Sequence, residues 1–477
     1  MGTPLAGTKS KKRKAKYDGD KEIVNNVKRN RRASNSGSSG LMVGKRKASN
    51  QAQGATKRKP KDKLIINKAP TKHLDIYVFG AGEMGELGLG RAQGQDEVKR
   101  PWLNPLLAAD KIGVVSLSVD TGLNFKESTP SAVDTAGLPV DIVWTQLTCT
   151  DSATFALTDN GNVYGWGTFR GNEVPGLHNI LQLAGGSNHV LALSNKGEVY
   201  AWGAGQQNQL SRRIIERRKL NGLVPTRVGL PKKIVLIGAG SYHSFAVTES
   251  GEVYSWGLNS FGETGIAAQI GDGEESDVHQ ATIVKSLRKF GKITCIDGGS
   301  HHTVAVTNEG ELLVWGRLDG FQLGLQLSSL PERDVIRDSA GHLRILKNPT
   351  QIPNIDAVYA SAGSDHCVAV ARDGKAYAWG FSENYQTGLG TKKDVELATQ
   401  IDKHDRDVDV SKTALNGNDD SDISDEEDSI PTANAKNDGD GIRGKKMVWA
   451  GCGGQFSILA GLAAAKPTDL NGVNGYA

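Results

Sequence analysis

Residues 240–257 read GSYHSFAVTESGEVYSWG and contain the pattern from which the architecture follows. Gly240 stands three residues before His243. Gly251 follows eight residues after this histidine, and a Trp-Gly step begins five residues later, at Trp256. Apolar and polar residues alternate on both sides of Gly251, which indicates two strands joined by a tight hairpin whose positive φ favours glycine. The stretch therefore predicts two neighbouring strands of an antiparallel sheet.

The same pattern recurs along the chain. A glycine precedes a Trp-Gly step by five residues in five units, at Gly161/Trp166, Gly197/Trp202, Gly251/Trp256, Gly310/Trp315 and Gly374/Trp379. Four of these units also carry a histidine, eight residues before the glycine and within a Gly-x-x-His turn: His189, His243, His302 and His366. Such regular spacing excludes coincidence. One unit is too small to bury both faces of its sheet, so the units are expected to pack radially as the blades of a β-propeller.

One unit illustrates the four-stranded sheet that we expect in each blade. Strands are predicted at residues 180–183 and 190–193, on the two sides of a Gly-x-x-His turn. A hairpin at residues 195–197 leads to a third strand at 199–202. A fourth strand at 224–228 follows a variable loop and completes the sheet.

The two ends of the chain supply parts of one further unit. Residues 447–459 provide its first two strands, and residues 76–80 provide a third that ends in Phe-Gly. We therefore expect an N- and C-terminal clasp that closes the ring. The predicted fold is all-β, a seven-bladed propeller with six recognisable units and one truncated blade. Of that blade, only a first strand at 112–119 and a fourth at 129–133 are expected.

The Trp166 unit is shorter than the others. The glycines of successive Trp-Gly steps are 36 residues apart between Gly167 and Gly203, whereas the next intervals are 54, 59 and 64 residues. No candidate for a fourth strand is present in this unit. A genuine loss of chain or a faulty gene model would explain both short places.

Composition excludes several other classes of protein. Glycine accounts for 59 of 477 residues without a period of three, which excludes collagen. Four cysteines without a CxxC pair exclude a disulfide scaffold and are expected to be reduced thiols. The N-terminus is basic without an apolar segment, and no apolar run approaches the roughly 18 residues of a spanning helix. We therefore expect a soluble, intracellular protein without membrane contact.

The formal net charge of +4 hides a strongly basic N-terminus. Residues 1–63 contain 19 Lys and Arg but 4 Asp and Glu, with too few apolar residues to offset the entropy of folding. We expect a disordered tail that serves both nuclear import and contact with DNA phosphates. The basic clusters include Lys11, Lys12, Arg13, Lys14, Arg31, Arg32, Lys57, Arg58 and Lys59.

Charged segments also interrupt the predicted propeller, which spans residues 74–462. Residues 402–428 contain 11 acidic and 3 basic residues, within an insertion at about 394–445 that we expect to be disordered. A disordered C-terminal tail is expected at 463–477. The loop after the second Trp-Gly step carries five cations in eight residues, which favours an acidic macromolecular partner over a merely solvated face: Arg212, Arg213, Arg217, Arg218 and Lys219.

These motifs together resemble the regulator of chromosome condensation family, and within it the chromatin-bound nuclear exchange factors of fungal type. The resemblance covers residues 74–462 and rests on the turns, the Trp-Gly steps and the basic tail. It implies a guanine nucleotide exchange factor for the small GTPase Ran, with one propeller face that binds Ran and expels GDP. It also implies that the basic loop binds the acidic patch of the nucleosome, that the tail binds DNA, and that a nuclear import receptor carries the protein into the nucleus.

The resemblance assigns the Ran-binding positions to the Gly-x-x-His turns, the first loop and the segment after the first Trp-Gly step. These positions are Glu83, Asp151, Asn188, His301, His302, Asp365 and Arg170. Asn188 and Phe456 depart from the family pattern, because Asn188 carries no charge and Phe456 replaces an imidazole. The turn histidines themselves are interpreted as structural residues that bond backbone across the blade, whereas Asp151, His301 and Asp365 occupy variable positions and are stronger functional candidates.

Exchange requires no covalent chemistry, because a partner that binds the empty GTPase better than the loaded one releases the nucleotide. The family places a protruding wedge after Trp166–Arg170, and here the following residues 171–176 are abbreviated. We therefore expect weakened or absent exchange. The alternative is a propeller scaffold of the same family without exchange activity. No metal-spaced cluster or nucleophile motif stands out, so we expect a monomeric regulator without metal or cofactor.

Overall fold

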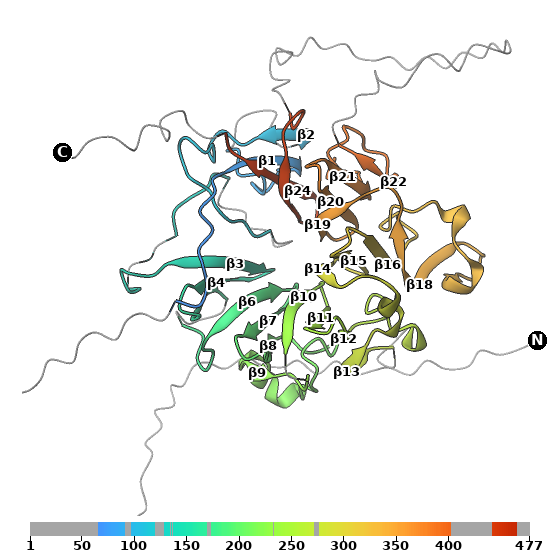
Figure 1. The fold of residues 1–477 in the computed structure, drawn as a ribbon, viewed down its shortest axis with the longest axis horizontal. Helices are drawn as coiled ribbons and strands as arrows, with labels where there is room; N and C mark the ends of the chain where they lie inside the picture. The colour runs from blue at the N-terminus through green and yellow to red at the C-terminus, as the bar shows by residue number, and fades with distance from the viewer. Residues whose placement is uncertain are drawn as a thin grey trace, which may run out of the picture. The chain divides into compact units, whose positions relative to one another are not determined.

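The computed structural model describes residues 65–90, 97–119, 128–133, 135, 137–168, 173–231, 233–270, 276–401 and 441–464. These residues belong to one compact unit, Asp62–Ala477, and the predicted tail 1–63 and most of the C-terminal tail fall outside them. The insertion at about 394–445 is described at both of its ends, and there the expectation of disorder was wrong, because Val395–Gln400 form a strand. Residues 402–440 lie outside the described residues. Within the described residues the fold is all-β, with six antiparallel sheets arranged as blades around a common centre (Figure 1). Six blades of the predicted seven-bladed propeller are thus confirmed. No helix among the described residues combines the length and apolarity that a membrane span requires.

We name each blade by its tryptophan. The Trp166 blade has three strands, β3 (Trp144–Thr150), β4 (Ala153–Thr158) and β5 (Val163–Gly167). The Trp202 blade has β6 (Ile180–Gly185), β7 (His189–Ser194), β8 (Val199–Gly203) and β9 (Thr226–Arg227). The Trp256 blade has β10 (Ile234–Ala239), β11 (His243–Thr248), β12 (Val253–Gly257) and β13 (Val278–Ile283).

Two further blades follow along the chain. The Trp315 blade has five strands, β14 (Ile293–Gly298), β15 (His302–Thr307), β16 (Leu312–Arg317), β18 (Leu343–Ile352) and β17 (Val335–Arg337). The Trp379 blade has β19 (Ala357–Ala362), β20 (His366–Ala371), β21 (Ala376–Gly380) and β22 (Val395–Gln400). Short 3-10 helices lie in the connections, namely η1 (Glu216–Leu223), η2 (Ala267–Gln269), η3 (Lys285–Lys289), η4 (Leu327–Ser329) and η5 (Glu332–Asp334).

The sixth sheet, the terminal blade, combines strands from the two ends of the described chain. Its strand order is β2-β1-β24-β23, with β1 (Leu74–Ala81), β2 (Glu97–Leu103), β23 (Met447–Cys452) and β24 (Phe456–Leu462). β1 pairs antiparallel with β24 over seven residue pairs, from Leu74↔Leu462 to Gly80↔Phe456. The predicted strands at 76–80 and 447–459 correspond to β1, β23 and β24, whereas β2 was not expected.

Hairpin glycines and Trp-Gly steps set the register within each blade. Gly251 has φ +90° in the turn between β11 and β12, as its position in the predicted hairpin requires. His243 then pairs with Gly257 across the same two strands. Because this pairing recurs in every blade that carries the motif, the Gly-x-x-His turn and the loop after Trp-Gly lie at the same end of each blade.

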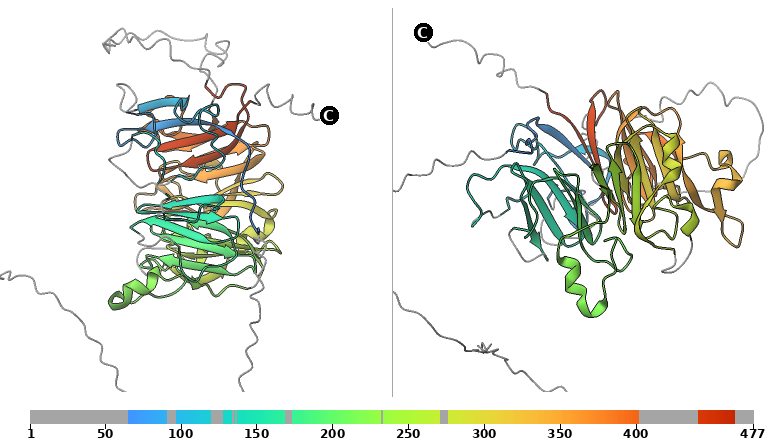
Figure 2. Two further views of the ribbon diagram at one scale, coloured as in Figure 1. Left: turned by 90° about the vertical axis from the view of Figure 1, so that its left-hand side faces the viewer. Right: turned by 60° about the horizontal axis from the view of Figure 1, so that its bottom comes forward.

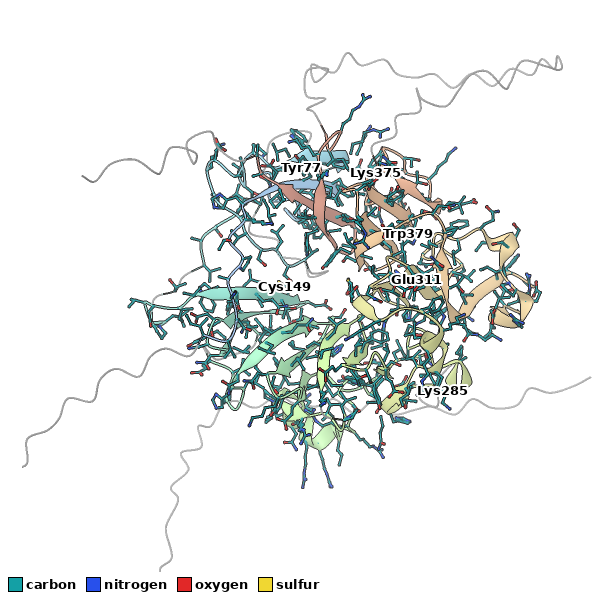
Figure 3. All side chains as sticks on the ribbon, viewed as in Figure 1. Tyr77, Cys149, Lys285, Glu311, Lys375 and Trp379 are labelled. Carbon is teal, nitrogen blue, oxygen red and sulfur yellow. The ribbon has the colours of Figure 1, made fainter. Side chains whose placement is uncertain are left out.

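Tryptophan side chains fill the core between neighbouring blades. The side chain of Trp315 is fully buried in a cluster that also contains Phe245 and Val247 of the preceding blade. The rings of Phe245 and Trp315 meet edge to face, with centroids 6.1 Å apart. Figure 3 shows side chains packed between the blades, while Lys285 and Lys375 lie on the outer edge. Burial of one large side chain at each junction therefore holds successive sheets together.

The prediction of strands at 112–119 and 129–133 was wrong. Neither range forms a strand in its described residues. The backbone N–H of Leu74 bonds to the carbonyl oxygen of Val114 at 2.8 Å, and Val114, Leu117 and Val119 pack against the core of the terminal blade. These apolar residues suit a strand by composition, but no strand among the described residues forms a ladder with their segment.

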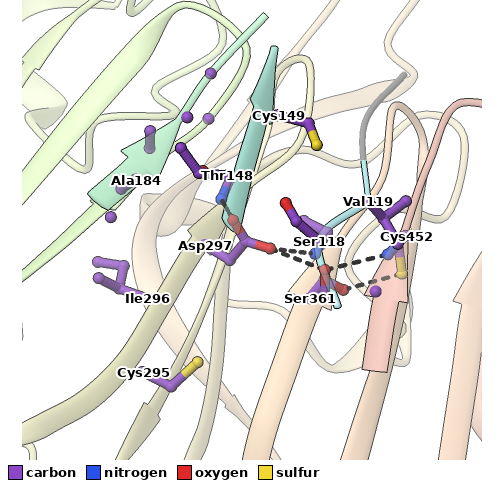
Figure 4. A pocket seen from close by; sticks show the side chains of 18 of the residues that line it. Ser118, Val119, Thr148, Cys149, Ala184, Cys295, Ile296, Asp297, Ser361 and Cys452 are labelled. Atoms are coloured by element: carbon purple, nitrogen blue, oxygen red, sulfur yellow. Dashed lines mark hydrogen bonds between the residues drawn. The ribbon is translucent and has the colours of Figure 1, made fainter. Parts of the chain in front are cut away.

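The central cavity measures about 480 Å³ and is lined by the innermost strand of each blade together with Ser116–Val119. Figure 4 shows Asp297 beside Ser361, whose hydroxyl donates to Asp297 Oδ2 at 2.9 Å. Burial raises the pKa of Asp297 to about 6. Cys452 Sγ bonds to the carbonyl oxygen of Ser361, and burial raises the pKa of this thiol to about 12, so Cys452 is an unreactive neutral group.

Candidate functional site

The turns between the first and second strands form a hydrogen-bonded belt at one end of the blades. The N–H of Asp151 bonds to the carbonyl oxygen of Ser187, and the N–H of Ser187 bonds to that of Ser241. Further bonds of this kind run from a backbone N–H to a carbonyl oxygen of the next turn, from Ser241 to Gly299, from Ser300 to Ser364 and from Ser364 to Gly453, at 3.1–3.3 Å. Residues at the variable turn positions are therefore held side by side on one surface.

Inside this belt, each turn histidine bonds to the next blade. The Nε2 atoms lie close to a hydroxyl or thiol of the following blade, in the pairs His189–Ser244 (2.8 Å), His243–Thr303 (3.0 Å), His302–Cys367 (3.1 Å) and His366–Ser457 (2.8 Å). The histidines are structural, as predicted, but their partners are side chains of a neighbouring blade and not backbone of their own.

The hydrogen bonds of the partner hydroxyls show which ring nitrogen of each histidine carries the proton. Thr303 Oγ1 donates its only proton to the carbonyl oxygen of Glu263, at 2.8 Å, so it accepts the bond from His243. The imidazole must therefore carry its proton on Nε2. Burial lowers the pKa of His189 and His366 to about 3 and that of His302 to about 4. The rings are neutral at physiological pH.

His302 is consequently not a surface contact, which corrects the Ran-binding position expected there. Its side chain is fully buried between two blades. The glycine of each turn has a related cause, because a Cβ at Gly240 would collide with the His243 ring. The Gly-x-x-His motif thus encodes packing of the imidazole beneath the turn.

A second repeated element follows the Trp-Gly step and was missed in the sequence. Seven residues after the aromatic residue stands a Gln or Glu whose side-chain oxygen accepts the N–H of the residue two positions earlier, at 2.7–3.0 Å. These residues are Glu86, Gln209, Glu263, Gln322 and Gln386. Their fixed distance from the preceding aromatic residue, seven positions, was the signal that could have revealed them.

The backbone of this repeat loop joins adjacent blades. The carbonyl oxygen of Gln209 accepts the indole N–H of Trp256 at 2.8 Å and the hydroxyl of Ser244 at 3.1 Å. Equivalent indole bonds run from Trp315 to Glu263 and from Trp379 to Gln322. Three of the five repeat loops therefore bind the tryptophan of the next blade.

Three of the predicted Ran-binding residues lie exposed on the belt or its first loop. Asn188 Nδ2 lies 3.5 Å from Asp151 Oδ2, so the structure brings these two residues together. Glu83 is exposed in the loop after β1. Arg170 lies outside the described residues, as do the nine predicted import and DNA-binding residues of the tail.

His301 belongs to a charged cluster that spans two blades. His301 Nδ1 lies 3.4 Å from Glu263 Oε1, and its ring lies 4.7 Å from that of Phe261. The guanidinium groups of Arg317 and Arg344 lie over the Phe261 ring, at 5.4 and 4.8 Å from its centroid. Sequence reasoning identified only His301, because the other four residues come from the loop after β12, from the end of β16 and from β18.

Asp365 lies next to the same cluster. Its Oδ1 accepts a 2.9 Å bond from Gln322 Nε2 and lies 3.7 Å from Arg317 Nη1. The cluster is therefore continuous from Glu263 through Arg317 to Asp365. Carboxylate, guanidinium and imidazole groups at one end of three blades provide a surface that a charged protein partner could bind.

The basic loop divides into one inward and several outward side chains. Arg212 donates to the carbonyl oxygens of Ala201, Gly222 and Val224 at 2.9–3.4 Å, and burial lowers its pKa. It therefore supports the loop from inside, which corrects its expected role as a partner contact. Arg213, Arg217, Arg218 and Lys219 are exposed in and beside η1, which protrudes from the Trp202 blade (Figure 2).

The described residues contain no cluster of three or more His, Cys, Asp and Glu side chains that could hold a metal ion. The four cysteines are free thiols, at Cys149, Cys295, Cys367 and Cys452. What the described surface offers is charged and polar side chains for protein contacts.

Comparison with known proteins identifies relatives over most of the chain. Protein pim1 of Schizosaccharomyces pombe is 36% identical, covering 86% of this chain and 78% of its own length. Guanine nucleotide exchange factor SRM1 of Saccharomyces cerevisiae is 32% identical, covering 82% and 87%. The crystal structure of Prp20p from Saccharomyces cerevisiae superposes with a TM-score of 0.70 at 32% identity, covering 84% of this chain and 96% of that one.

A family model described as RCC1-like domain matches residues 115–418, which is more than half of the chain. The match includes five of the six blades. The resemblance inferred from the turns and Trp-Gly steps is thereby confirmed, and the chain belongs to the regulator of chromosome condensation family.

Proposed function

We propose that this protein is a guanine nucleotide exchange factor for the small GTPase Ran and that it promotes GDP release on chromatin in the nucleus. The observation that carries the proposal is the belt, which presents Asp151, Asn188, His301 and Asp365 from four of five successive turns at one end of the blades. One partner can contact all of them together. The name of SRM1 as an exchange factor and the reported binding of Prp20p to Gsp1p and histones support this function.

The proposed mechanism is differential binding, without covalent chemistry. Nucleotide held at picomolar to nanomolar affinity is stabilised by about 12–16 kcal/mol, and the partner must bind the empty GTPase more tightly to release it. Asp151 and Asp365 supply carboxylates that compete for the cations which otherwise hold the phosphates. The neutral, interblade histidines keep these turns fixed, so little binding energy is lost in ordering them.

Chromatin binding is assigned to the exposed part of the basic loop and to residues 1–63. Arg213, Arg217 and Arg218 point outward, and a planar guanidinium suits bidentate contact with carboxylates such as those of the histone acidic patch. The tail is proposed to bind DNA phosphates and an import receptor. The crystal structure titled Kap60 bound to yeast RCC1 (Prp20), 32% identical to this chain, supports the latter.

For the whole chain we propose a propeller of residues 74–462, closed by the terminal blade as a clasp and flanked by the basic tail 1–63 and a C-terminal tail 463–477. The part of the insertion that follows β22, residues 402–440, is proposed to be an acidic loop, and the protein is proposed to act as a monomer. The abbreviated segment after Trp166 is proposed to weaken exchange without abolishing binding of the GTPase.

Because the segment after Trp166 is abbreviated, a second function is also proposed, that of a scaffold which binds Ran without releasing its nucleotide. Titration of the full chain with nucleotide-free Ran and with Ran–GDP distinguishes an exchange factor, a scaffold and a protein that does not bind Ran. An exchange factor binds nucleotide-free Ran at least about tenfold more tightly, and excess GDP dissociates the complex. A scaffold binds both forms equally, and failure to bind either form contradicts both proposals.

A further inference from the structure

Two buried side chains of the repeat loops contact turn residues of the next blade. Gln322 Nε2 donates to Asp365 Oδ1 at 2.9 Å. Glu263 Oε1 lies 3.4 Å from His301 Nδ1. The two loop residues are fully buried, whereas the side chains of Asp365 and His301 are 37% and 28% exposed. Asp365 and His301 occupy the same turn position, directly before the turn histidine, so a buried group of one blade supports an exposed group of the next.

The orientation of the Gln322 side chain is fixed by its own loop. Its Oε1 accepts the N–H of Gly320 at 2.9 Å, so its NH2 group is turned toward Asp365. Its carbonyl oxygen accepts the indole N–H of Trp379 at 2.8 Å, which holds the backbone beneath the side chain. Asp365 Oδ1 is therefore occupied. In the part of the chain that the structure describes, Asp365 Oδ2 makes no hydrogen bond, so this oxygen is left for a partner.

Glu263 supports His301 in the same way. Glu263 Oε2 accepts the N–H of Phe261 at 2.7 Å, which leaves Oε1 to face Nδ1 of the imidazole. An ionised carboxylate can only accept, so the proton of a neutral His301 ring lies on Nδ1. The Phe261 ring, whose centroid lies 4.7 Å from that of the imidazole, also limits rotation of the histidine. His301 Nε2, which has no hydrogen bond to any described residue, is thereby presented as an acceptor.

Two other repeat loops do not make this contact. Gln209 Nε2 donates to Gln207 Oε1 of its own loop at 3.3 Å, and Gln386 Nε2 is buried without a partner among the described residues. The turn residues at these junctions are Tyr242 and Gln455, neither of which carries a charge at neutral pH. Among these four junctions, complementary pairs therefore occur where the turn carries a carboxylate or an imidazole.

We propose that Gln322 and Glu263 are positioning residues for the surface that binds the GTPase. The first aims Oδ2 of Asp365, and the second aims Nε2 of His301, at donor groups of the partner. This role rests on the exchange function proposed above. A side chain that is already oriented loses less conformational entropy on binding. Both presented atoms are acceptors, so the expected partner groups are lysine, arginine or backbone N–H donors of the GTPase.

One substitution made in two backgrounds tests the pairing, with calorimetric titration of the full chain by nucleotide-free Ran. Gln322→Glu keeps the oxygen that accepts the Gly320 N–H but replaces the donor to Asp365 by a second carboxylate oxygen. It should weaken binding by about fivefold or more. In an Asp365→His background the same substitution reproduces the natural pair of Glu263 and His301, and it should strengthen binding relative to Asp365→His alone. An equal loss in both backgrounds would show a merely structural role and overturn the proposal.

Gln209→Glu is the matched control at a junction without the pair. Its side-chain amide bonds Gln207, whose own amide can turn its NH2 group toward the new carboxylate. Glutamate occupies the same repeat position at Glu86 and Glu263, so the loop accommodates it. The affinity for nucleotide-free Ran should be unchanged. A loss as large as that of Gln322→Glu would contradict the proposal, because it would arise without a contact to a turn residue.

A second measurement covers the case in which Gln322→Glu does not fold, and it does not require Ran. In the full chain labelled with side-chain ¹⁵N-glutamine, Asp365→Ala removes the acceptor and should shift the amide signals of Gln322 but not those of Gln209. Unchanged Gln322 signals would overturn the pairing and leave the exchange function intact. Failure of the unaltered chain to bind nucleotide-free Ran would instead contradict the exchange function, and with it the positioning role.

Discussion

His243 Nε2 lies 3.0 Å from Thr303 Oγ1, and this bond joins the second strand of one blade to the second strand of the next. The Thr303 hydroxyl in turn donates its proton to the carbonyl oxygen of Glu263, which also accepts the indole N–H of Trp315. His243, the Thr303 hydroxyl, the Glu263 carbonyl and Trp315 thus form one hydrogen-bonded unit at this junction. The repeat is therefore held together mainly by contacts between blades, which explains why single blades do not need to be stable alone.

Thr303→Val should destabilise the fold by about 1–3 kcal/mol. The substitution leaves His243 Nε2 without an acceptor in a fully buried position, and such unpaired groups retain their desolvation cost. Urea unfolding followed by circular dichroism measures the effect. Thr303→Ser, which keeps the hydroxyl found naturally at Ser244 and Ser457, should cost less than Thr303→Val. Equal losses of stability in the two variants would show that the hydroxyl is not what matters.

Acid should weaken the fold before it protonates most carboxylates. Burial lowers the pKa of His189 and His366 from 6.5 to about 3, so between these values the unfolded chain binds more protons than the folded one. Stability is therefore present above pH 6.5 and decreases as the pH falls. Protonation of Asp297, whose pKa is raised to about 6, stabilises the fold as the pH falls. This opposite effect comes from one group, whereas four buried histidines lower the stability.

The urea midpoint should accordingly decrease between pH 7 and pH 5. His366→Phe reproduces the residue found at the equivalent position in the terminal blade, Phe456, and should reduce this pH dependence. A midpoint that stays constant or rises on acidification would contradict the assignment of neutral, buried imidazoles.

Arg212 and Arg217 should respond differently to alanine substitution. Arg212→Ala removes the partner of three main-chain carbonyls and should lower stability by about 1–3 kcal/mol. Arg217→Ala alters an exposed side chain and should change stability by less than about 0.5 kcal/mol while weakening binding to nucleosomes. Thermal unfolding and nucleosome gel shifts provide the two readouts. Unchanged nucleosome affinity in an Arg213, Arg217 and Arg218 triple alanine variant would exclude the basic loop from chromatin binding.

Deletion of residues 1–63 should flatten the salt dependence of DNA binding. The tail contains 19 Lys and Arg, and the slope of log affinity against log salt should decrease by about one for every phosphate that the shortened chain no longer binds. Fluorescence anisotropy with duplex DNA at several salt concentrations gives both slopes. An identical slope for the full and shortened chains would show that the tail does not bind DNA phosphates.

Much of the fold follows from the sequence because glycine and tryptophan occupy positions with strict geometric needs. Gly251 has the positive φ of its hairpin, and Trp256 fills an interblade core. The strand that was wrongly predicted at residues 112–119 also has a physical explanation. Residues 112–119 have the apolar composition of a strand, but a strand must pair with a neighbour, and spacing alone could not show that the part of the chain which the structure describes provides none.

The site was harder to infer, because the roles of its residues depend on contacts with other blades and loops. Histidines in a repeated turn could have been surface ligands or buried links, and only the position of Ser244 in the next blade distinguishes the two. Arg212 and Arg217 are chemically identical in the sequence, yet one faces carbonyl oxygens and the other faces solvent. Contacts between loops of different blades, such as Arg317 with Asp365, have no fixed spacing along the chain.

The rate of GDP release from Ran tests the proposed exchange function most directly. Ran loaded with fluorescent GDP is mixed with a catalytic amount of the full chain and excess unlabelled nucleotide. We expect release faster than the intrinsic rate, and about tenfold less acceleration for Asp365→Asn, equivalent to about 1.4 kcal/mol. Asp373→Asn, in the hairpin at the other end of β20, is the matched control and should retain full activity. Release at the intrinsic rate, or equal activity of the two variants, would contradict the account.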